Sequence, residues 1–228
     1  MEKKEHIIIS LGGSLIVPDD IDTNLLKSFV ELIKEYTSKG FKFVVITGGG
    51  KICRHYQQAI TTISGSNNEQ LDTLGIAVTR LNAHLVRACF GDSAYADIII
   101  DPDNIPTTDK PVLVGGGWKP GNSSDLAAVH SAKSIGAKKI INLSNIDYVY
   151  NKDPRKFPDA IKIEKNNWSD FRALLPKDWD PGLIVPFDPV AAKEAEALGL
   201  EVVIMNGKNI DNLRNYLEGK DFIGSVVK

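Results

Sequence analysis

Two uninterrupted apolar runs, each followed directly by glycines, constrain the fold more than any other feature of the sequence. The run from His6 to Leu11 reads HIIISL before Gly12 and Gly13, and the run at 41–47 reads FKFVVIT before three more glycines. An apolar run without polar alternation predicts a strand buried on both faces, as in a parallel sheet covered by helices. Ligands bind such sheets beyond the carboxyl ends of the strands, where these glycines lie.

Helices are predicted between the strands. Apolar residues recur at helical spacing over 25–36, with Asp22 or Thr23 as the N-cap and Gly40 as the stop. Further strands are predicted at 96–100, 111–114, 139–143, 201–205 and near 223–227, and further helices at 126–135, 171–175, 190–198 and 210–217. The segment 155–168 is charged and is predicted to be a loop, as is the proline- and glycine-rich segment 176–186. This order predicts an α/β fold, a three-layer αβα sandwich with a mostly parallel central sheet.

A long helix is predicted from Gln70 onwards. Its expected apolar stripe consists of Leu71, Leu74, Val78, Leu81, Leu85 and Ala88. Four polar residues, Asp72, Arg80, Asn82 and His84, lie off that stripe. A charged residue in such a position is by default solvated or paired, so the pattern alone assigns these four no function.

The stretch 115–154 combines two features that suit phosphate. A glycine turn at 115–117 lets backbone N–H groups approach an anion, and the polar corner 122–125 opens a helix whose first N–H groups have no partner within the helix. Asp125 would repel phosphate, so it is better suited to hold a lysine, a metal ion or a capping N–H group. The alternative is that the corner is only an N-cap and the glycines only a turn.

A second anion site is predicted where Arg54 follows the glycines at 48–50 on the first turn of a helix. Its guanidinium would add a planar fork of donors to the backbone N–H groups. The alternative is a surface arginine after a tight turn. Neither glycine loop matches the G-x-x-x-x-G-K-[ST] or G-x-G-x-x-G pattern, so phosphate would be held differently here.

Composition limits the class of function. The 228 residues carry a formal net charge of -2, which suggests neither a nucleic-acid nor a membrane surface. Cys53 and Cys89 lack C-x-x-C spacing, so neither a disulfide framework nor a zinc site is expected. The chain shows no apolar stretch of the length of a signal or membrane segment, and a cytoplasmic location is expected.

Six motifs stand in order along the chain: LGGSL at 11–15, TGGGKICR at 47–54, LDTLGIAVTRLNAHLV at 71–86, GGWKPGNSSDLAA at 116–128, NLSNIDYVYNKDPRKFPDA at 142–160 and FDPVAAKEAEALGLEVVIMNG at 187–207. Together they resemble the amino-acid kinase family over nearly the whole chain, and within it the archaeal-type uridylate kinases. The subfamily resemblance depends on the spacing of Asp72, Gly75, Ile76, Leu81 and Asn82.

The resemblance implies a single amino-acid kinase domain over 1–228, with an acceptor part at about 1–115 and an ATP part at about 116–228. It implies γ-phosphoryl transfer from ATP to UMP with Mg²⁺, and a hexamer. The implied catalytic residues are Gly12, Gly13 and Asp125, the last orienting the catalytic cation or lysine. The implied UMP-binding residues are Gly48, Gly49, Arg54, Asp72, Asn122, Ser123 and Ser124. The implied ATP-binding residues are Ser10, Ser144, Asn145, Tyr150, Lys152 and Asp153, and no metal-ligand set in the protein is implied.

Two positions depart from the family pattern. Ser10 occupies the place of a lysine on the first strand, whose loss from a closed site costs on the order of 3 kcal/mol in the transition state. Tyr148 stands in place of a glycine. A lysine from another segment, Lys51, Lys119 or Lys152, or an extra metal ion is the expected substitute in a working kinase.

The sequence leaves more than one function open. The Arg54 and Asp72 pattern favours a nucleoside-monophosphate kinase acting on UMP. The missing lysine favours a catalytically weakened nucleotide-binding or molybdate-storage-like protein of the same fold. A kinase for another small phosphate or carboxylate agrees less well with the acceptor motifs.

Overall fold

The computed structural model describes residues 6–177 and 185–228. The strands are β1 (His6–Leu11), β2 (Lys42–Thr47), β3 (Val112–Gly115), β4 (Lys139–Ser144), β5 (Val149–Tyr150), β6 (Lys162–Ile163), β7 (Lys165–Asn166), β8 (Glu201–Asn206) and β9 (Ser225–Val227). The helices are α1 (Gly13–Ile16), α2 (Thr23–Ser38), α3 (Gly50–Ser64), α4 (Asn68–Phe90), α5 (Ser124–Ile135), α6 (Trp168–Ala173), α7 (Pro189–Ala197) and α8 (Ile210–Leu217), with a 3₁₀ turn at Gly91–Ser93. The loop predicted at 176–186 falls largely on 178–184, outside the described residues.

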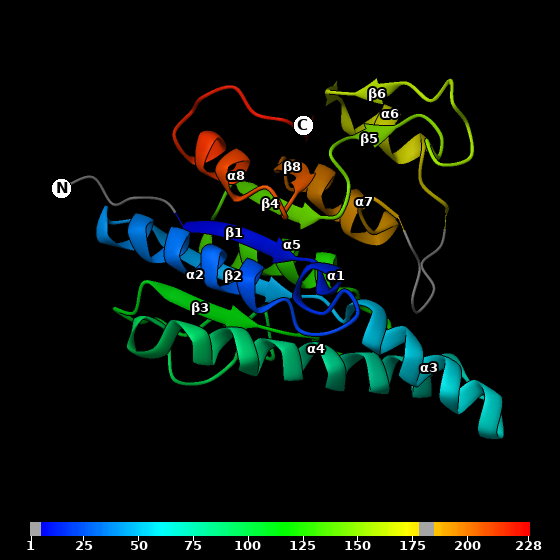
Figure 1. Ribbon diagram of the computed structural model, residues 1–228, viewed down its shortest axis with the longest axis horizontal. Coiled ribbons are helices and arrows are strands. Elements are labelled where there is room, and N and C mark those ends of the chain that lie inside the picture. The colour runs from blue at the N-terminus through cyan, green and yellow to red at the C-terminus, as the bar shows by residue number, and fades with distance from the viewer. Residues whose placement is uncertain (1–5, 178–184) are drawn as a thin grey trace.

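The main sheet has seven strands in the order β3-β2-β1-β4-β8-β9-β7. Strands β3, β2, β1, β4 and β8 are all parallel, so their carboxyl ends meet at one edge, as Figure 1 shows. Strand β9 runs antiparallel to β8 and closes the far side of the sheet with β7. The mostly parallel α/β fold predicted from the sequence is confirmed.

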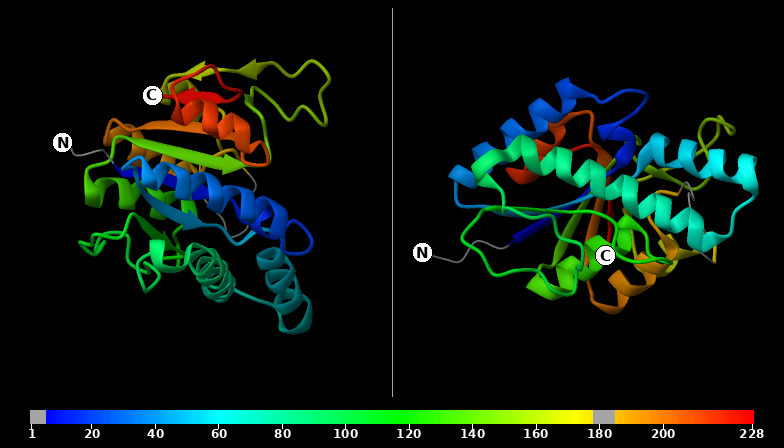
Figure 2. Two further views of the ribbon diagram at one scale, coloured as in Figure 1. Left: turned by 60° about the vertical axis from the view of Figure 1, so that its left-hand side comes forward. Right: turned by 90° about the horizontal axis from the view of Figure 1, so that it is seen from below.

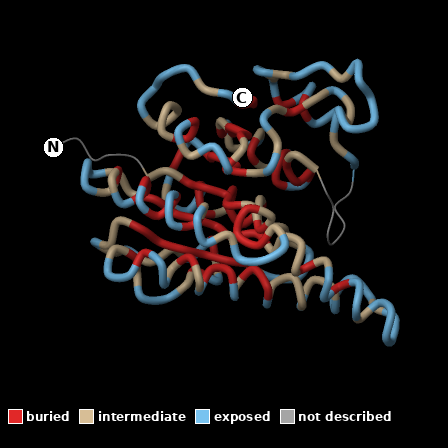
Figure 3. Tube along the Cα trace, in the orientation of Figure 1, coloured by how far each residue is buried: buried red, intermediate tan, exposed pale blue. Residues whose placement is uncertain are grey.

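Helices cover both faces of the sheet. Apolar side chains of α1, α2, α4 and α8 pack on one face, where they meet alternate strand residues such as Ile9, Val45 and Leu143. Helices α5, α6 and α7 pack on the other face against the intervening residues, such as Ile8 and Val44. The buried trace in Figure 3 accordingly follows the central strands and the inner sides of the helices. These are the three predicted layers.

The caps at helix starts arise from short polar side chains. Asp22 caps α2 by accepting a hydrogen bond from the Leu25 N–H group at 2.9 Å. Helix α4 begins with a capping box, in which Asn67 and Gln70 each accept a hydrogen bond from the other's backbone N–H group. Figure 2 shows that α3 and the first half of α4 form a pair of helices projecting beyond the rest of the molecule.

The prediction for the buried side of α4 was wrong by about one residue. Leu81 is 64% exposed and Ala88 is exposed, whereas Thr79 and Asn82 are buried. Asn82 was predicted to lie off the buried face, yet its Nδ2 atom donates to the Gly48 carbonyl at 2.8 Å. A count of apolar residues misses such positions, because a buried amide with a hydrogen-bond partner is as acceptable as a leucine.

Two further predictions fail in the connecting segments. The strand predicted at 96–100 is absent, because the chain bends at Ala96 and Asp97 and contacts β3 only through isolated bridges at Ala94 and Ile99. The segment 155–168, predicted to be a loop, contains β6 and β7. These two-residue strands carry mostly polar, solvent-facing side chains and so give no apolar signal.

Candidate active site

The two glycine loops after β1 and β2 pack directly against each other. The Gly12 N–H group donates to the Leu143 carbonyl and the Gly48 N–H group donates to the Leu11 carbonyl, both at 2.9 Å. A Cβ atom at Gly13 would lie 2.2 Å from the Gly50 nitrogen, so no side chain fits there. The glycines therefore allow two backbone turns to touch at the carboxyl edge of the sheet.

A cavity of about 180 Å³ opens beside these turns. It is lined by Gly49, Gly50, Cys53, Arg54, Gln57, Asp72, Gly75, Ile76, Thr79, Gly117, Asn122, Ser123 and Ser124. Six of the seven residues predicted to bind an acceptor are among them. The seventh, Gly48, is absent from the lining, and its carbonyl is held by Asn82.

Three helix N-termini deliver the polar groups of this cavity. Arg54 lies on the first turns of α3, and its guanidinium forms no ion pair within 6–177 or 185–228. Asp72 lies near the start of α4, and its Oδ2 atom accepts a hydrogen bond from the Gly121 N–H group at 2.6 Å. Ser123 caps α5 through its Oγ atom, which accepts from Leu126 at 3.1 Å. The cavity thus combines a cation, a carboxylate and unpaired helical N–H groups.

The polar face of α4 completes the cavity, and the sequence pattern did not assign it a function. Thr79 Oγ1 accepts a hydrogen bond from the Gly117 N–H group at 2.7 Å. Arg80 donates from Nε to the Gly117 carbonyl at 3.0 Å and from Nη2 to the Trp118 carbonyl at 2.9 Å. These bonds hold the glycine turn after β3 over the cavity. The sequence feature that could have indicated this face is the spacing of Asp72, Ile76 and Thr79, which places the three on one side of a helix.

Asp125 lies behind the cavity, at the point where β1, α5 and α7 meet. Its Oδ1 atom accepts a hydrogen bond from Ser10 Oγ at 3.0 Å, and its Oδ2 atom accepts from the Asp188 N–H group at 3.1 Å. Burial, with a smaller contribution from the neighbouring Asp188 carboxylate, raises the pKa of Asp125 to about 7. A backbone N–H group, one of the three expected kinds of partner, is thus in contact with this carboxylate.

Apart from Ser10 on β1, the predicted ATP residues lie at the end of β4, in the loop that follows it, in β5 and in the segment after β5. Ser144 ends β4 and Tyr150 lies in β5, while Asn145 is exposed in the loop between them. Lys152 pairs with Asp159 at 2.6 Å. Asp153 accepts two side-chain hydrogen bonds from Arg155, which hold the pKa of that carboxyl below its usual value.

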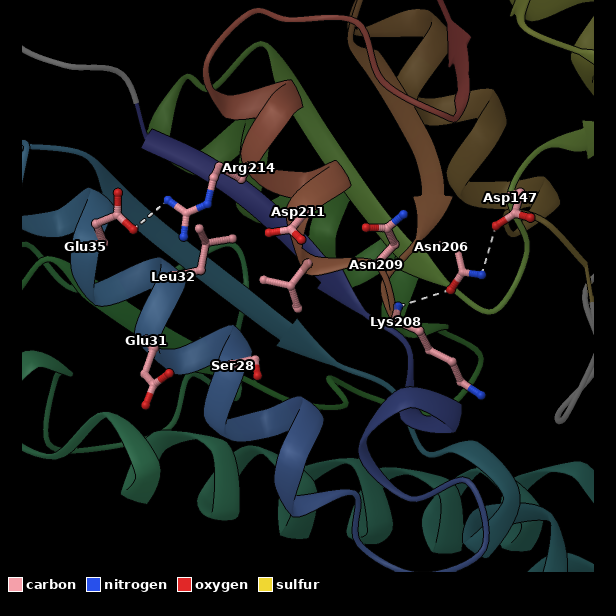
Figure 4. Close-up of a pocket in the computed structure, with 11 residues that line it drawn as sticks. Ser28, Glu31, Leu32, Glu35, Asp147, Asn206, Lys208, Asn209, Asp211 and Arg214 are labelled. Carbon is pink, nitrogen blue, oxygen red and sulfur yellow. Dashed lines mark hydrogen bonds and ion pairs between the residues drawn. The ribbon is translucent and has the colours of Figure 1, made fainter.

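A second, larger cavity of about 820 Å³ lies between α2 and α8, and no sequence pattern predicted it. It is lined by Ser28, Glu31, Leu32, Glu35, Asp147, Asn206, Lys208, Asn209, Ile210, Asp211 and Arg214. Figure 4 shows two features of it: a Glu35–Arg214 ion pair of 2.6 Å at one end, and the loop after β8 at the other. That loop is tied to Asp147, whose Oδ1 atom accepts from Asn206 Nδ2 at 2.9 Å.

Metal ligands and membrane spans were also sought. Within 6–177 and 185–228, no group of three or more His, Cys, Asp and Glu side chains is placed to hold a metal ion. No helix in the same ranges is long and apolar enough to cross a membrane.

Known proteins resemble this chain in sequence and in structure. A model of the amino acid kinase family matches residues 5–206. The uridylate kinase of Methanobrevibacter smithii is 33% identical over 97% of this chain and 98% of its own. The uridylate kinase of Methanospirillum hungatei is 33% identical over 97% and 94%, respectively. The crystal structure of uridylate kinase from Archaeoglobus fulgidus superposes with a TM-score of 0.82 at 28% identity, over 97% of this chain and 99% of that one. UMP kinase from Bacillus anthracis, at 18% identity and a TM-score of 0.77 over 98% and 96% of the two chains, shares the fold.

Proposed function

The chain belongs to the amino acid kinase family, and we propose that it transfers the γ-phosphoryl group of ATP to UMP, giving UDP and ADP. The observation that carries the proposal is the acceptor cavity, in which Arg54, Asp72 and the Ser123 cap converge. A nucleoside monophosphate needs a cation for its phosphate and a hydrogen-bond acceptor for its ribose diol, and this cavity offers both.

The acceptor cavity suggests how UMP is held. Arg54 and the backbone at Gly48 and Gly49 bind its phosphate. Asp72 accepts hydrogen bonds from the ribose hydroxyls through Oδ1, which has no partner among the described residues. Residues 122–124 contact the base and the phosphate from the start of α5. The acceptor therefore lies with its phosphate toward the touching glycine turns.

ATP approaches the same turns from the β4 side. Gly12 and Gly13 lie against its transferring phosphates, and Ser144, Asn145 and Tyr150 contact its adenosine half. Lys152 and Asp153 lie on the following loop. Mg²⁺ bound to the phosphates of ATP would neutralise part of their charge.

Phosphoryl transfer of this kind depends on positioning and charge stabilisation. The bond between the γ-phosphorus and the β–γ bridging oxygen breaks as a UMP phosphate oxygen bonds to the γ-phosphorus. The attacking oxygen is already ionised, so the protein does not need a general base. Asp125 acts by fixing β1, α5 and α7 relative to one another through Ser10 and the Asp188 backbone.

The binding-only alternative is not favoured, because the relatives with the highest similarity reported above are named as kinases. We also propose that the chain forms a single amino-acid kinase domain and that it assembles into a homohexamer in the cytoplasm. Exposed apolar side chains on the projecting helices support a subunit contact there: Ile63 is 82% exposed and Leu81 is 64% exposed. Light scattering at micromolar concentration tests this assembly, and a monomeric mass would contradict it.

A coupled assay of ADP release tests the proposed reaction. The panel contains UMP, CMP, AMP and GMP, each with ATP and Mg²⁺. We expect turnover with UMP to exceed that with each other monophosphate. Equal rates across the panel, or no release with any member, would refute the assignment.

A further inference from the structure

The carboxyl edge of β1 lacks the positive charge that phosphoryl transfer requires. Ser10 is 2% exposed, and its hydroxyl donates to Asp125 rather than pointing to an open ligand site. Negative charge accumulates on the phosphoryl oxygens in the transition state, so some cation has to meet it.

The three lysines expected to replace this charge are all engaged elsewhere. Lys51 forms an ion pair with Asp19. The Lys119 ammonium lies over the Trp118 ring, 3.7 Å from its centre. Lys152 pairs with Asp159 at 2.6 Å. Each of the three would have to exchange this partner for a phosphate in order to supply the charge.

A fourth lysine, Lys208, directly follows β8 at the same carboxyl edge. The preceding residue, Gly207, donates its N–H group to the Ser144 carbonyl at 2.9 Å. A Cβ atom at Gly207 would lie 2.3 Å from Leu15 Cδ1 and 3.0 Å from Leu143 Cβ. The loop is therefore pressed against both α1 and the end of β4, between the two segments proposed to contact ATP.

The backbone of Lys208 is fixed while its side chain is open. Its N–H group donates to Asn206 Oδ1 at 3.0 Å, and the Asn206 side chain is held in turn by Asp147. Figure 4 shows the Lys208 side chain running toward the α1 turn. Its ammonium group forms no ion pair with any residue in the described ranges, and it borders the cavity of about 820 Å³.

We propose that the Lys208 ammonium contacts the β- and γ-phosphates of ATP and supplies the charge that Ser10 does not. This inference rests on the proposed phosphoryl transfer. Lys208 stays protonated throughout, since its part is electrostatic and no proton moves. It binds ATP more strongly than ADP because the γ-phosphate brings additional negative charge to the ammonium.

The deciding experiment measures the ATP and ADP affinities of wild type, Lys208→Met, Lys208→Arg and Lys220→Met by calorimetry with Mg²⁺. Lys220 is the matched control, because it follows α8, pairs with Glu218 and does not line the cavity. We expect Lys208→Met to lose about tenfold in its ATP-to-ADP affinity ratio and about a hundredfold in kcat with UMP. Lys208→Arg should keep most of the ratio, and Lys220→Met should match wild type in both.

The outcomes separate the inference from the proposed function. If wild type releases no ADP with any monophosphate, the proposed function fails, and the affinity ratio still tests Lys208. If wild type is active while Lys208→Met keeps the wild-type ATP-to-ADP ratio, the assignment of Lys208 is overturned. Thermal unfolding of each variant checks the fold, and the exposed side chain predicts unchanged melting temperatures.

Discussion

The acceptor side and the nucleotide side of the sheet edge are built differently. On the acceptor side, side chains from the first turns of α3, α4 and α5 converge on one cavity, and Arg54 forms no ion pair with another described residue. On the nucleotide side, the predicted residues lie on the loop and hairpin after β4, where Lys152 and Asp153 are engaged with Asp159 and Arg155.

The difference suggests that the acceptor side binds with little rearrangement, whereas the nucleotide side exchanges ion-pair partners when it binds. A cation that leaves one carboxylate for a phosphate gains only the difference between two interactions. A free guanidinium in a formed cavity gains a new one. Substitutions on the two sides should therefore differ in the size of their effects.

The largest effect is expected at Gly13, where the two sides meet. Gly13→Ala places a methyl group 2.2 Å from the Gly50 nitrogen, a backbone atom that cannot turn aside. We expect the free energy of unfolding to fall by about 3 kcal/mol or more, measured by urea denaturation. Gly75→Ala in α4 is the control, since a Cβ atom there would lie 3.5 Å from its nearest neighbours, Cys53 Sγ and Gln57 Nε2 of α3. Equal stability of the two variants would contradict the packing of the turns.

The next effect tests the acceptor side alone. Arg54→Ala removes its free cation, and we expect UMP affinity to fall by about 2–3 kcal/mol, on the order of a hundredfold. Calorimetry with UMP and ATP in turn measures this, and ATP affinity should stay the same. Arg172→Ala, which breaks an exposed pair with Glu196, is the matched control. Equal UMP affinity in wild type and Arg54→Ala would exclude this arginine from the acceptor site.

The same contrast separates what the sequence predicts from what it does not. Strands β1, β2, β4 and β8 are predictable because burial on both faces requires continuous apolar runs. Cavity residues such as Arg54 and Ser123 are predictable because they stand at the starts of helices that follow a glycine or polar turn. Parallel topology then brings those starts to one edge. Asp72 was assigned a role only by the family resemblance.

What remained hidden depends on contacts between distant segments. Thr79 and Arg80 hold the turn at 117–118 through hydrogen bonds that span 37 or 38 residues, and no local pattern identifies those distant partners. In the sequence, Lys208 resembles an ordinary surface lysine. Only the packing of Gly207 on Leu15 shows that it lies beside α1. The conformation of a charged loop is hard to predict from its sequence, because alternative ion pairs on the surface have similar energies.

A smaller effect concerns Asp125, which joins the two sides. Its pKa of about 7 in the folded protein exceeds the ordinary value of 3.8. Between these values the folded state keeps a proton that the unfolded state has lost, so stability falls as pH rises from about 4 to 7 and levels off above. Asp125→Asn removes this fall. We expect the variant to gain about 1–2 kcal/mol on wild type between pH 5.5 and pH 7, measured by urea denaturation.

The control for this pH dependence is Asp159→Asn, whose carboxylate is 77% exposed. It should follow the wild-type curve. The quantity to follow is the free energy of unfolding of wild type minus that of Asp125→Asn. If this difference is constant or increases between pH 5 and 7, Asp125 is ionised throughout that range and the prediction is wrong.

The smallest effect is expected at Lys152 and tests the exchange of partners directly. Its pair with Asp159 is largely solvent-exposed and contributes at most about 1 kcal/mol, so a phosphate that replaces Asp159 adds little. We expect Lys152→Ala to lower ATP affinity by less than about threefold. Asp159→Ala gives the opposite sign, because it frees the ammonium, and should raise ATP affinity slightly. Lys156→Ala on the same loop is the control for lost charge.

A tenfold loss of ATP affinity in Lys152→Ala, with no gain in Asp159→Ala, would mean that Lys152 is already available to the nucleotide. The proposed difference between the two sides would then be wrong.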